Sequence, residues 1–253
     1  MGVERSFAGP LRVSDLLAME MAEGRVPTTE ELIDVALGWT GAGPAAITRP
    51  ELFSFFEKSL APALERAGRG STFIGFVRDI LERVPEKLYR PVTDIALPSN
   101  IKTKLISQFR VPTRLAEEYY KWLIEPERRG LAFKHPSAKQ PFIIALNPKT
   151  MRATTPVHEM MHYYSYPEIF SDTVREVIEE AYKSQISPVL KPGLEYLTST
   201  ALHKPSEIIA ELGAQYLVAP LHAKPYWAGV IGKLPIPYQI WLRSILTRLG
   251  ENI

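Results

Sequence analysis

One five-residue segment constrains this sequence more than any other: His158-Glu159-Met160-Met161-His162, an H-E-x-x-H pattern. It follows Pro156, and proline is favoured in the first turn of a helix. We therefore expect a helix that starts near Thr155 and stops near Pro167. Residues four apart on a helix differ by about 40° in direction and about 6 Å in height, so both imidazoles would project from one face.

Two imidazoles on one helix face can bind a single Zn²⁺ at about 2.0–2.1 Å each. Glu159 points about 100° away round the helix, where its carboxylate can act as general base on a water activated by the metal. With five histidines in 253 residues, the pattern arises by chance in roughly 0.5% of such chains. The alternative is a pair of surface histidines, but the flanking residues are mostly apolar, and burying unpaired histidines would be costly. These neighbours are Val157, Met160, Met161, Tyr163 and Tyr164.

A third zinc ligand must come from elsewhere, because a catalytic zinc usually has three protein ligands and one open position. Glu207 is favoured, since it begins an apolar-periodic segment that predicts a helix. Glu211 lies four residues later on the same face, where it could hydrogen-bond a ligand histidine. Glu195 remains the alternative third ligand, whereas Glu180 falls on the polar face of a predicted helix.

The rest of the chain predicts a mixed α+β fold. Residues 1–87 are predicted to be helical, with helices at 13–21, 28–37 and 72–83. A capping box at Thr48 and Glu51 predicts the start of one more helix. Residues 88–253 are predicted to form a second domain, with a strand at 92–97 and a helix at 113–124. A second strand is predicted where five apolar residues follow Pro141, namely Phe142, Ile143, Ile144, Ala145 and Leu146.

Composition excludes several classes of protein. Thirty basic and 28 acidic residues give a net charge of +2, which argues against a nucleic-acid partner. There is no cysteine, so thiolate zinc sites are impossible. No apolar run reaches the ~18 residues of a membrane span. The charged residues near the start, with no apolar stretch among them, lead us to expect no Sec-type signal peptide. We expect a cytoplasmic protein, or one secreted by a specialised route or as a fragment of a larger protein; composition leaves the oligomeric state open.

The H-E-x-x-H motif followed by a distant glutamate on a second helix resembles the gluzincin metallopeptidases. Within them, the sequence resembles the catalytic domain of anthrax lethal factor and related bacterial effector toxins. Several segments follow in the same order as in that family over roughly residues 88–250, namely 92–98, 142–148, 158–162, 197–199, 207–211 and a last helix near 238–249. The resemblance implies a zincin-like domain at 88–253, zinc bound by His158, His162 and Glu207, and Glu159 as the general base. The implied activity is zinc-dependent hydrolysis of a protein or peptide, in a toxin, an effector or a phage-type protease.

Two further expectations come from the same resemblance. The family places a tyrosine near the metal to stabilise the oxyanion, but Thr200 occupies that register here, with Tyr196 and His203 as substitutes nearby. The alternative function is therefore a catalytically weak or inactive zincin-fold module for binding or structure. The strand at 142–146 is expected to be the sheet edge above the metal, pairing with an extended substrate through main-chain hydrogen bonds.

Overall fold

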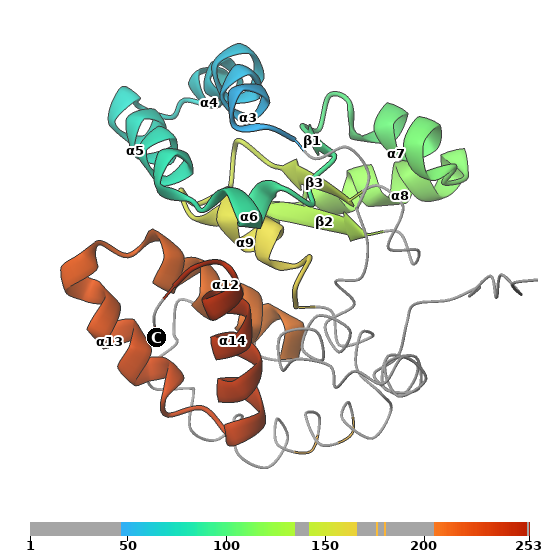
Figure 1. The fold of residues 1–253 in the computed structure, drawn as a ribbon. Coiled ribbons are helices and arrows are strands. Elements are labelled where there is room, and N and C mark those ends of the chain that lie inside the picture. The colour runs from blue at the N-terminus through green and yellow to red at the C-terminus, as the bar shows by residue number, and fades with distance from the viewer. Residues whose placement is uncertain (1–46, 135–141, 166–175, 177–179, 181–204, 252) are drawn as a thin grey trace, which may run out of the picture.

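The structure, a computed structural model, describes residues 47–134, 142–165, 176, 180, 205–251 and 253. The helices predicted before residue 47 lie outside these residues, as do four candidate site residues, Glu195, Tyr196, Thr200 and His203. The described part is a mixed α+β fold with a three-stranded sheet (Figure 1). The predicted α+β class is therefore confirmed, and the strand at 142–146 is confirmed as β3.

The described N-terminal helices follow their predicted signals closely. The capping box forms as expected: the Thr48 hydroxyl accepts from the Glu51 backbone, and the Glu51 carboxylate accepts from the Thr48 N–H at 2.7 Å. The helix predicted over 72–83 is α5, and it starts one residue earlier. The helices of this region are α3 (Arg49–Phe55), a π-helix η1 (Phe56–Leu60), α4 (Ala61–Arg66), α5 (Ser71–Arg83) and α6 (Glu86–Tyr89).

The sheet has β3 (Phe142–Leu146) in its centre. β1 (Asp94–Ala96) pairs with it in parallel, and β2 (Gly130–Lys134) pairs with it antiparallel. All five residues of β3 are buried, and both of its edges are paired. The prediction that residues 142–146 form the substrate edge is therefore wrong.

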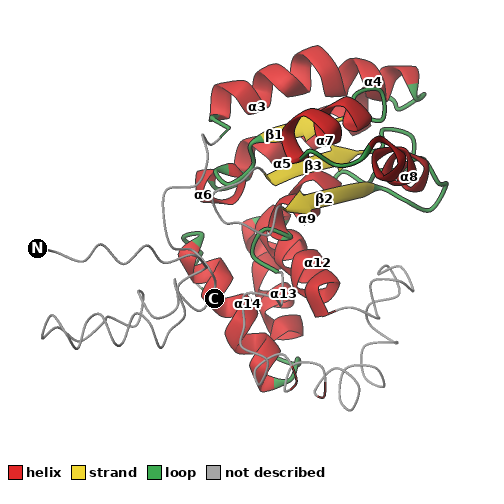
Figure 2. Cartoon of the chain, turned by 90° about the vertical axis from the view of Figure 1, so that its right-hand side faces the viewer, coloured by secondary structure: helices red, strands yellow, loops and turns green. Residues whose placement is uncertain are grey.

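The alternation of side chains along β3 separates two hydrophobic cores. Ile143 and Ala145 face a smaller core, which is covered by α7 (Ile101–Phe109) and α8 (Thr113–Leu123) (Figure 2). Phe142, Ile144 and Leu146 face a larger core on the other side of the sheet. This period-two pattern is the one expected of a strand buried on both faces.

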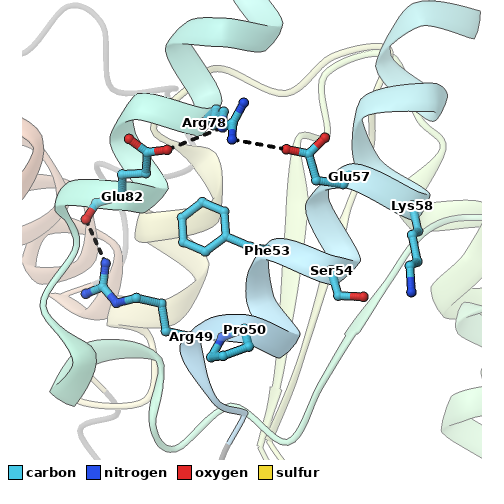
Figure 3. A pocket seen from close by; sticks show the side chains of 8 residues that line it. All are labelled: Arg49, Pro50, Phe53, Ser54, Glu57, Lys58, Arg78 and Glu82. Carbon is cyan, nitrogen blue, oxygen red and sulfur yellow. Dashed lines mark hydrogen bonds and ion pairs between the residues drawn. The ribbon is translucent and has the colours of Figure 1, made fainter.

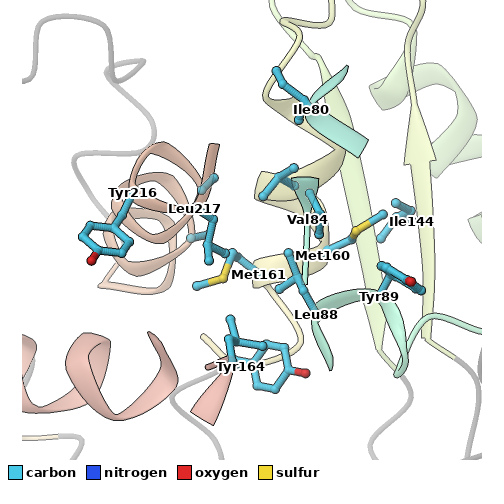
Figure 4. Close-up of a cluster of buried hydrophobic side chains, with 14 of the residues drawn as sticks. Ile80, Val84, Leu88, Tyr89, Ile144, Met160, Met161, Tyr164, Tyr216 and Leu217 are labelled. Atoms are coloured by element: carbon cyan, nitrogen blue, oxygen red, sulfur yellow. The ribbon is translucent and has the colours of Figure 1, made fainter. Parts of the chain in front are cut away.

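The larger core joins the N-terminal helices, the sheet and the C-terminal helices (Figure 4). Leu52 of α3 and Ile209 of α12 (Pro205–Val218) belong to the same cluster of buried side chains. This cluster extends across the boundary predicted between residues 87 and 88. The division into two domains stays a prediction. None of the described helices is long and apolar enough to cross a lipid bilayer. The helices of this part are α9 (Thr155–Met161), α12 (Pro205–Val218), a 3-10 turn η5 (Leu221–Ala223), α13 (Lys224–Ile231) and α14 (Ile236–Arg248).

Helices α9 and α12 pack against each other, and Gly213 of α12 faces Met161 of α9. A Cβ atom built on Gly213 would lie 3.2 Å from the Met161 Sδ and still closer to the terminal methyl group of that side chain. A larger residue at this position would therefore displace the flexible end of Met161. The contact matters for the site, because α9 carries the histidine motif and α12 carries Glu207 and Glu211.

Candidate metal centre

The H-E-x-x-H motif straddles the end of α9 rather than lying inside a longer helix. The helix ends at Met161, and His162 is its C-cap with helical backbone angles (φ −59°, ψ −24°). The sequence predicted a helix that continues to near Pro167, whereas α9 ends at Met161. Because His162 keeps helical backbone angles, the two histidines still have the i, i+4 geometry of a helix. Tyr164 fixes the segment beyond the motif: its hydroxyl donates to the Lys87 carbonyl at 2.6 Å, and its own carbonyl accepts from the Trp241 indole at 3.3 Å.

Three side chains converge at this helix end. The Nε2 atoms of His158 and His162 lie 3.1 Å apart. One Glu207 oxygen lies 3.2 Å from the His158 Nε2, and the other lies 3.6 Å from the His162 Nε2. The three prospective ligand atoms all fall within 4.8 Å of one another. The structure thus brings together the two histidines and the glutamate that the sequence favoured over Glu195 and Glu180; Glu180 is exposed.

The chemistry of these side chains suits zinc. Two imidazoles and one carboxylate are the donor set of one class of catalytic zinc site. Ligand atoms at about 2.0–2.1 Å from a tetrahedral ion are about 3.3–3.4 Å from each other. The two Nε2 atoms are 3.1 Å apart and the Glu207 Oε2 is 3.2 Å from the His158 Nε2, whereas the 3.6 Å contact of the His162 Nε2 is with the other carboxylate oxygen, Oε1. The three residues therefore suit the ion in chemistry, and their donor atoms lie close enough to share one ion.

His158 is held by a second carboxylate on its other ring nitrogen. The His158 Nδ1 lies 3.0 Å from the Glu211 Oε2, and the other Glu211 oxygen accepts from the Gln215 amide at 2.9 Å. A carboxylate on Nδ1 fixes the ring and leaves Nε2 facing the prospective ion. This is the supporting role that the i, i+4 spacing of Glu207 and Glu211 predicted.

Three carboxylates give the centre a high density of negative charge. Burial lowers the pKa of His158, but its hydrogen bonds to Glu207 and Glu211 and the charge of Glu159 outweigh burial and raise the pKa well above its usual value. Burial favours a higher pKa for Glu207, yet the charge of His162 and the hydrogen bond from His158 hold it well below its usual range. A divalent cation would take the place of the proton on His158, so metal binding is expected to release a proton.

His162 is oriented by a residue that the sequence interpretation missed. Its Nδ1 lies 3.1 Å from the Ser165 hydroxyl, and Ser165 is fully buried. A hydroxyl oxygen can accept the Nδ1 proton, which fixes the tautomer that leaves Nε2 free for a metal. The only sequence feature that points to this contact is a serine three residues after the second histidine. This pattern is too common to indicate a role.

Replacing Ser165 by alanine should therefore weaken zinc binding. Loss of a hydrogen bond that orients a metal ligand typically lowers metal affinity 10- to 100-fold, and we expect about tenfold here because the partner is a neutral hydroxyl. Competition of the apo protein with a fluorescent zinc chelator would measure the change. Ser244→Ala, which removes an exposed hydroxyl bonded to the Ile240 carbonyl, is the matched control. Equal affinity of Ser165→Ala and wild type would refute the assigned role.

Glu159 lies beside the cluster but is not one of the three converging ligands. Its side chain is buried, with 6% of the residue exposed. Burial raises its pKa, partly opposed by the positive charge on His158 and His162. A carboxylate with a raised pKa is a better proton acceptor than an ordinary one. This placement suits the general-base role that the motif predicted.

Comparison with known protein families, curated proteins and solved structures gives no match for this chain.

A separate open cavity of about 660 Å³ lies in the N-terminal helical layer (Figure 3). Arg78 crosses its wall by pairing with Glu57 at 3.5 Å and Glu82 at 3.3 Å. Arg49 donates to the carbonyls of Glu82 and Val84. Both guanidinium groups thus bind neighbouring protein atoms, and none of the residues around this cavity belongs to the histidine cluster. The cavity is explained by the packing of α3 and η1 against α5.

Proposed function

We propose that this protein is a zinc-dependent endopeptidase with a zincin-like domain. The observation that carries the proposal is the convergence of His158, His162 and Glu207, whose prospective ligand atoms lie within 4.8 Å of one another and form a donor set known from catalytic zinc sites. His158 and His162 would bind the ion through Nε2, and Glu207 through a carboxylate oxygen. Glu211 and Ser165 would hold the two imidazoles in place.

A bound zinc ion supplies Lewis acidity, which lowers the pKa of water and polarises a carbonyl group. Glu159 then accepts the proton of the attacking water and returns it to the leaving amine. Its burial assists this role, because the raised pKa of the carboxyl group increases its basicity. Glu211 and Ser165 take no proton from the substrate; they keep the imidazoles of His158 and His162 oriented.

Hydrolysis of a mixed peptide library by the zinc-loaded protein tests the proposal. We expect cleavage that a chelator abolishes and that added Zn²⁺ restores. Cleavage that survives complete removal of metal would contradict the proposal. Stoichiometric zinc without cleavage of any peptide would favour the alternative, an inactive zincin-fold module. The toxin, effector or phage-type setting rests on the resemblance to lethal factor alone.

A further inference from the structure

The carboxylate arm of Glu159 fills the space that a side chain at Gly130 would need. A Cβ atom built on Gly130 would lie 2.7 Å from the Glu159 Cγ, 2.8 Å from its Cδ and closer still to its Oε1. Real Cβ atoms essentially never approach other heavy atoms within 3.0 Å. The first position of β2 therefore has no room for any residue larger than glycine while Glu159 keeps this position.

The backbone conformation does not explain this glycine. Among the described residues, the glycines with positive φ are Gly68 and Gly250, so Gly130 adopts a backbone region open to other residues. Glycine at the start of a strand also costs conformational entropy and contributes no side-chain packing. The close approach of Glu159 is the remaining reason for a glycine at this position.

Neither partner can easily move away. The chain just before Gly130 is held by Asn147, whose backbone N–H donates to the Arg129 carbonyl at 2.9 Å and whose amide donates to the Arg128 carbonyl at 3.3 Å. Glu159 is buried on α9, which packs against both β2 and β3. The clash involves Cγ as well as the carboxylate, so rotation of the end of the side chain would not relieve it.

We infer that Gly130 is a positioning residue for Glu159: by having no side chain, it forms the recess that holds the Glu159 carboxylate beside the His158–His162–Glu207 cluster. The functional part of this inference rests on the proposed peptidase activity. The steric part rests only on the positions of the Gly130 backbone and the Glu159 side chain. A methyl group in the recess would displace the carboxylate while leaving the three prospective metal ligands in place.

A double-mutant cycle in unfolding equilibria tests the steric part without any assay of activity. Gly130→Ala is expected to shift the equilibrium at least about tenfold toward the unfolded state, as overpacking of a buried site does. In a Glu159→Ala background the space is empty, so the same substitution should cost little. Gly75→Ala on exposed α5, where a Cβ meets nothing within 4 Å, should have the same effect in both backgrounds. If Gly130→Ala fails to fold alone but folds together with Glu159→Ala, the inference is supported; an equal penalty in both backgrounds overturns it.

The positioning part is tested on any library peptide that the wild-type protein cleaves. Gly130→Ala should retain stoichiometric zinc and lose about 10²-fold in kcat with little change in KM, because misplacing a catalytic group by about 1 Å has an effect of that size. Unchanged kcat in this variant would overturn the positioning role. If zinc-loaded wild type cleaves nothing, the proposed function fails, and the unfolding cycle still decides whether Gly130 and Glu159 are coupled.

Discussion

Glu159→Gln is expected to lower peptide hydrolysis by about 10³-fold and to leave zinc binding intact. Glutamine has the shape of glutamate but cannot accept a proton at neutral pH, and a positioned general base contributes about 10²–10⁴-fold to the rate. Glu159 makes no direct contribution to the proposed ligand set, so the metal should remain. The measurement is kcat on a cleaved library peptide together with elemental analysis of the same sample.

The matched control for this substitution is Glu86→Gln on the surface of α6. Glu86 is exposed and lies outside the cluster, so its variant should cleave at the wild-type rate. A Glu159→Gln protein that hydrolyses peptide as fast as wild type would exclude Glu159 as the base. In that case the buried carboxylate beside Gly130 would need another explanation.

Glu207→Ala is expected to abolish the stabilisation of the protein by zinc. An ion that binds only the folded state at 100 times its Kd adds about 2.7 kcal/mol to the free energy of unfolding. Wild-type protein should gain this amount on addition of zinc and lose it with a chelator. The variant retains two imidazoles but lacks the carboxylate of the ligand set. Its affinity for zinc should therefore be too low for the ion to stabilise it at the same zinc concentration.

Thermal or denaturant unfolding with and without zinc measures this difference. Glu180→Ala is a suitable control, because Glu180 is an exposed helical residue outside the cluster. It should show the full zinc-dependent shift. If Glu207→Ala is stabilised by zinc as much as wild type, Glu207 is not a ligand.

The candidate metal centre was predictable in part, because two pairs of its side chains are set by local spacing. Residues four apart on one helix share a face whatever the rest of the fold does, which held for His158 with His162 and for Glu207 with Glu211. The pairing of Glu211 with His158 followed from the same argument. The length of α9 was overestimated, since the sequence around the motif remains apolar after the helix ends at Met161.

Strand order could not be predicted in the same way, because it depends on contacts far apart in the sequence. The run of apolar residues at 142–146 is typical of a strand buried on both faces, and β3 is indeed central. The role of Gly130 could not be predicted either, since it depends on how closely Glu159 of α9 approaches the start of β2. Ser165 is close in sequence, yet its role depends on how the chain turns after α9.

The most direct test of the account is the zinc content of wild type, Glu207→Ala and Glu195→Ala, purified side by side without chelators. Elemental analysis should find about one zinc per chain in wild type and in Glu195→Ala, and almost none in Glu207→Ala. Absence of metal from the wild-type protein, or full zinc content in Glu207→Ala, would contradict a centre built from His158, His162 and Glu207.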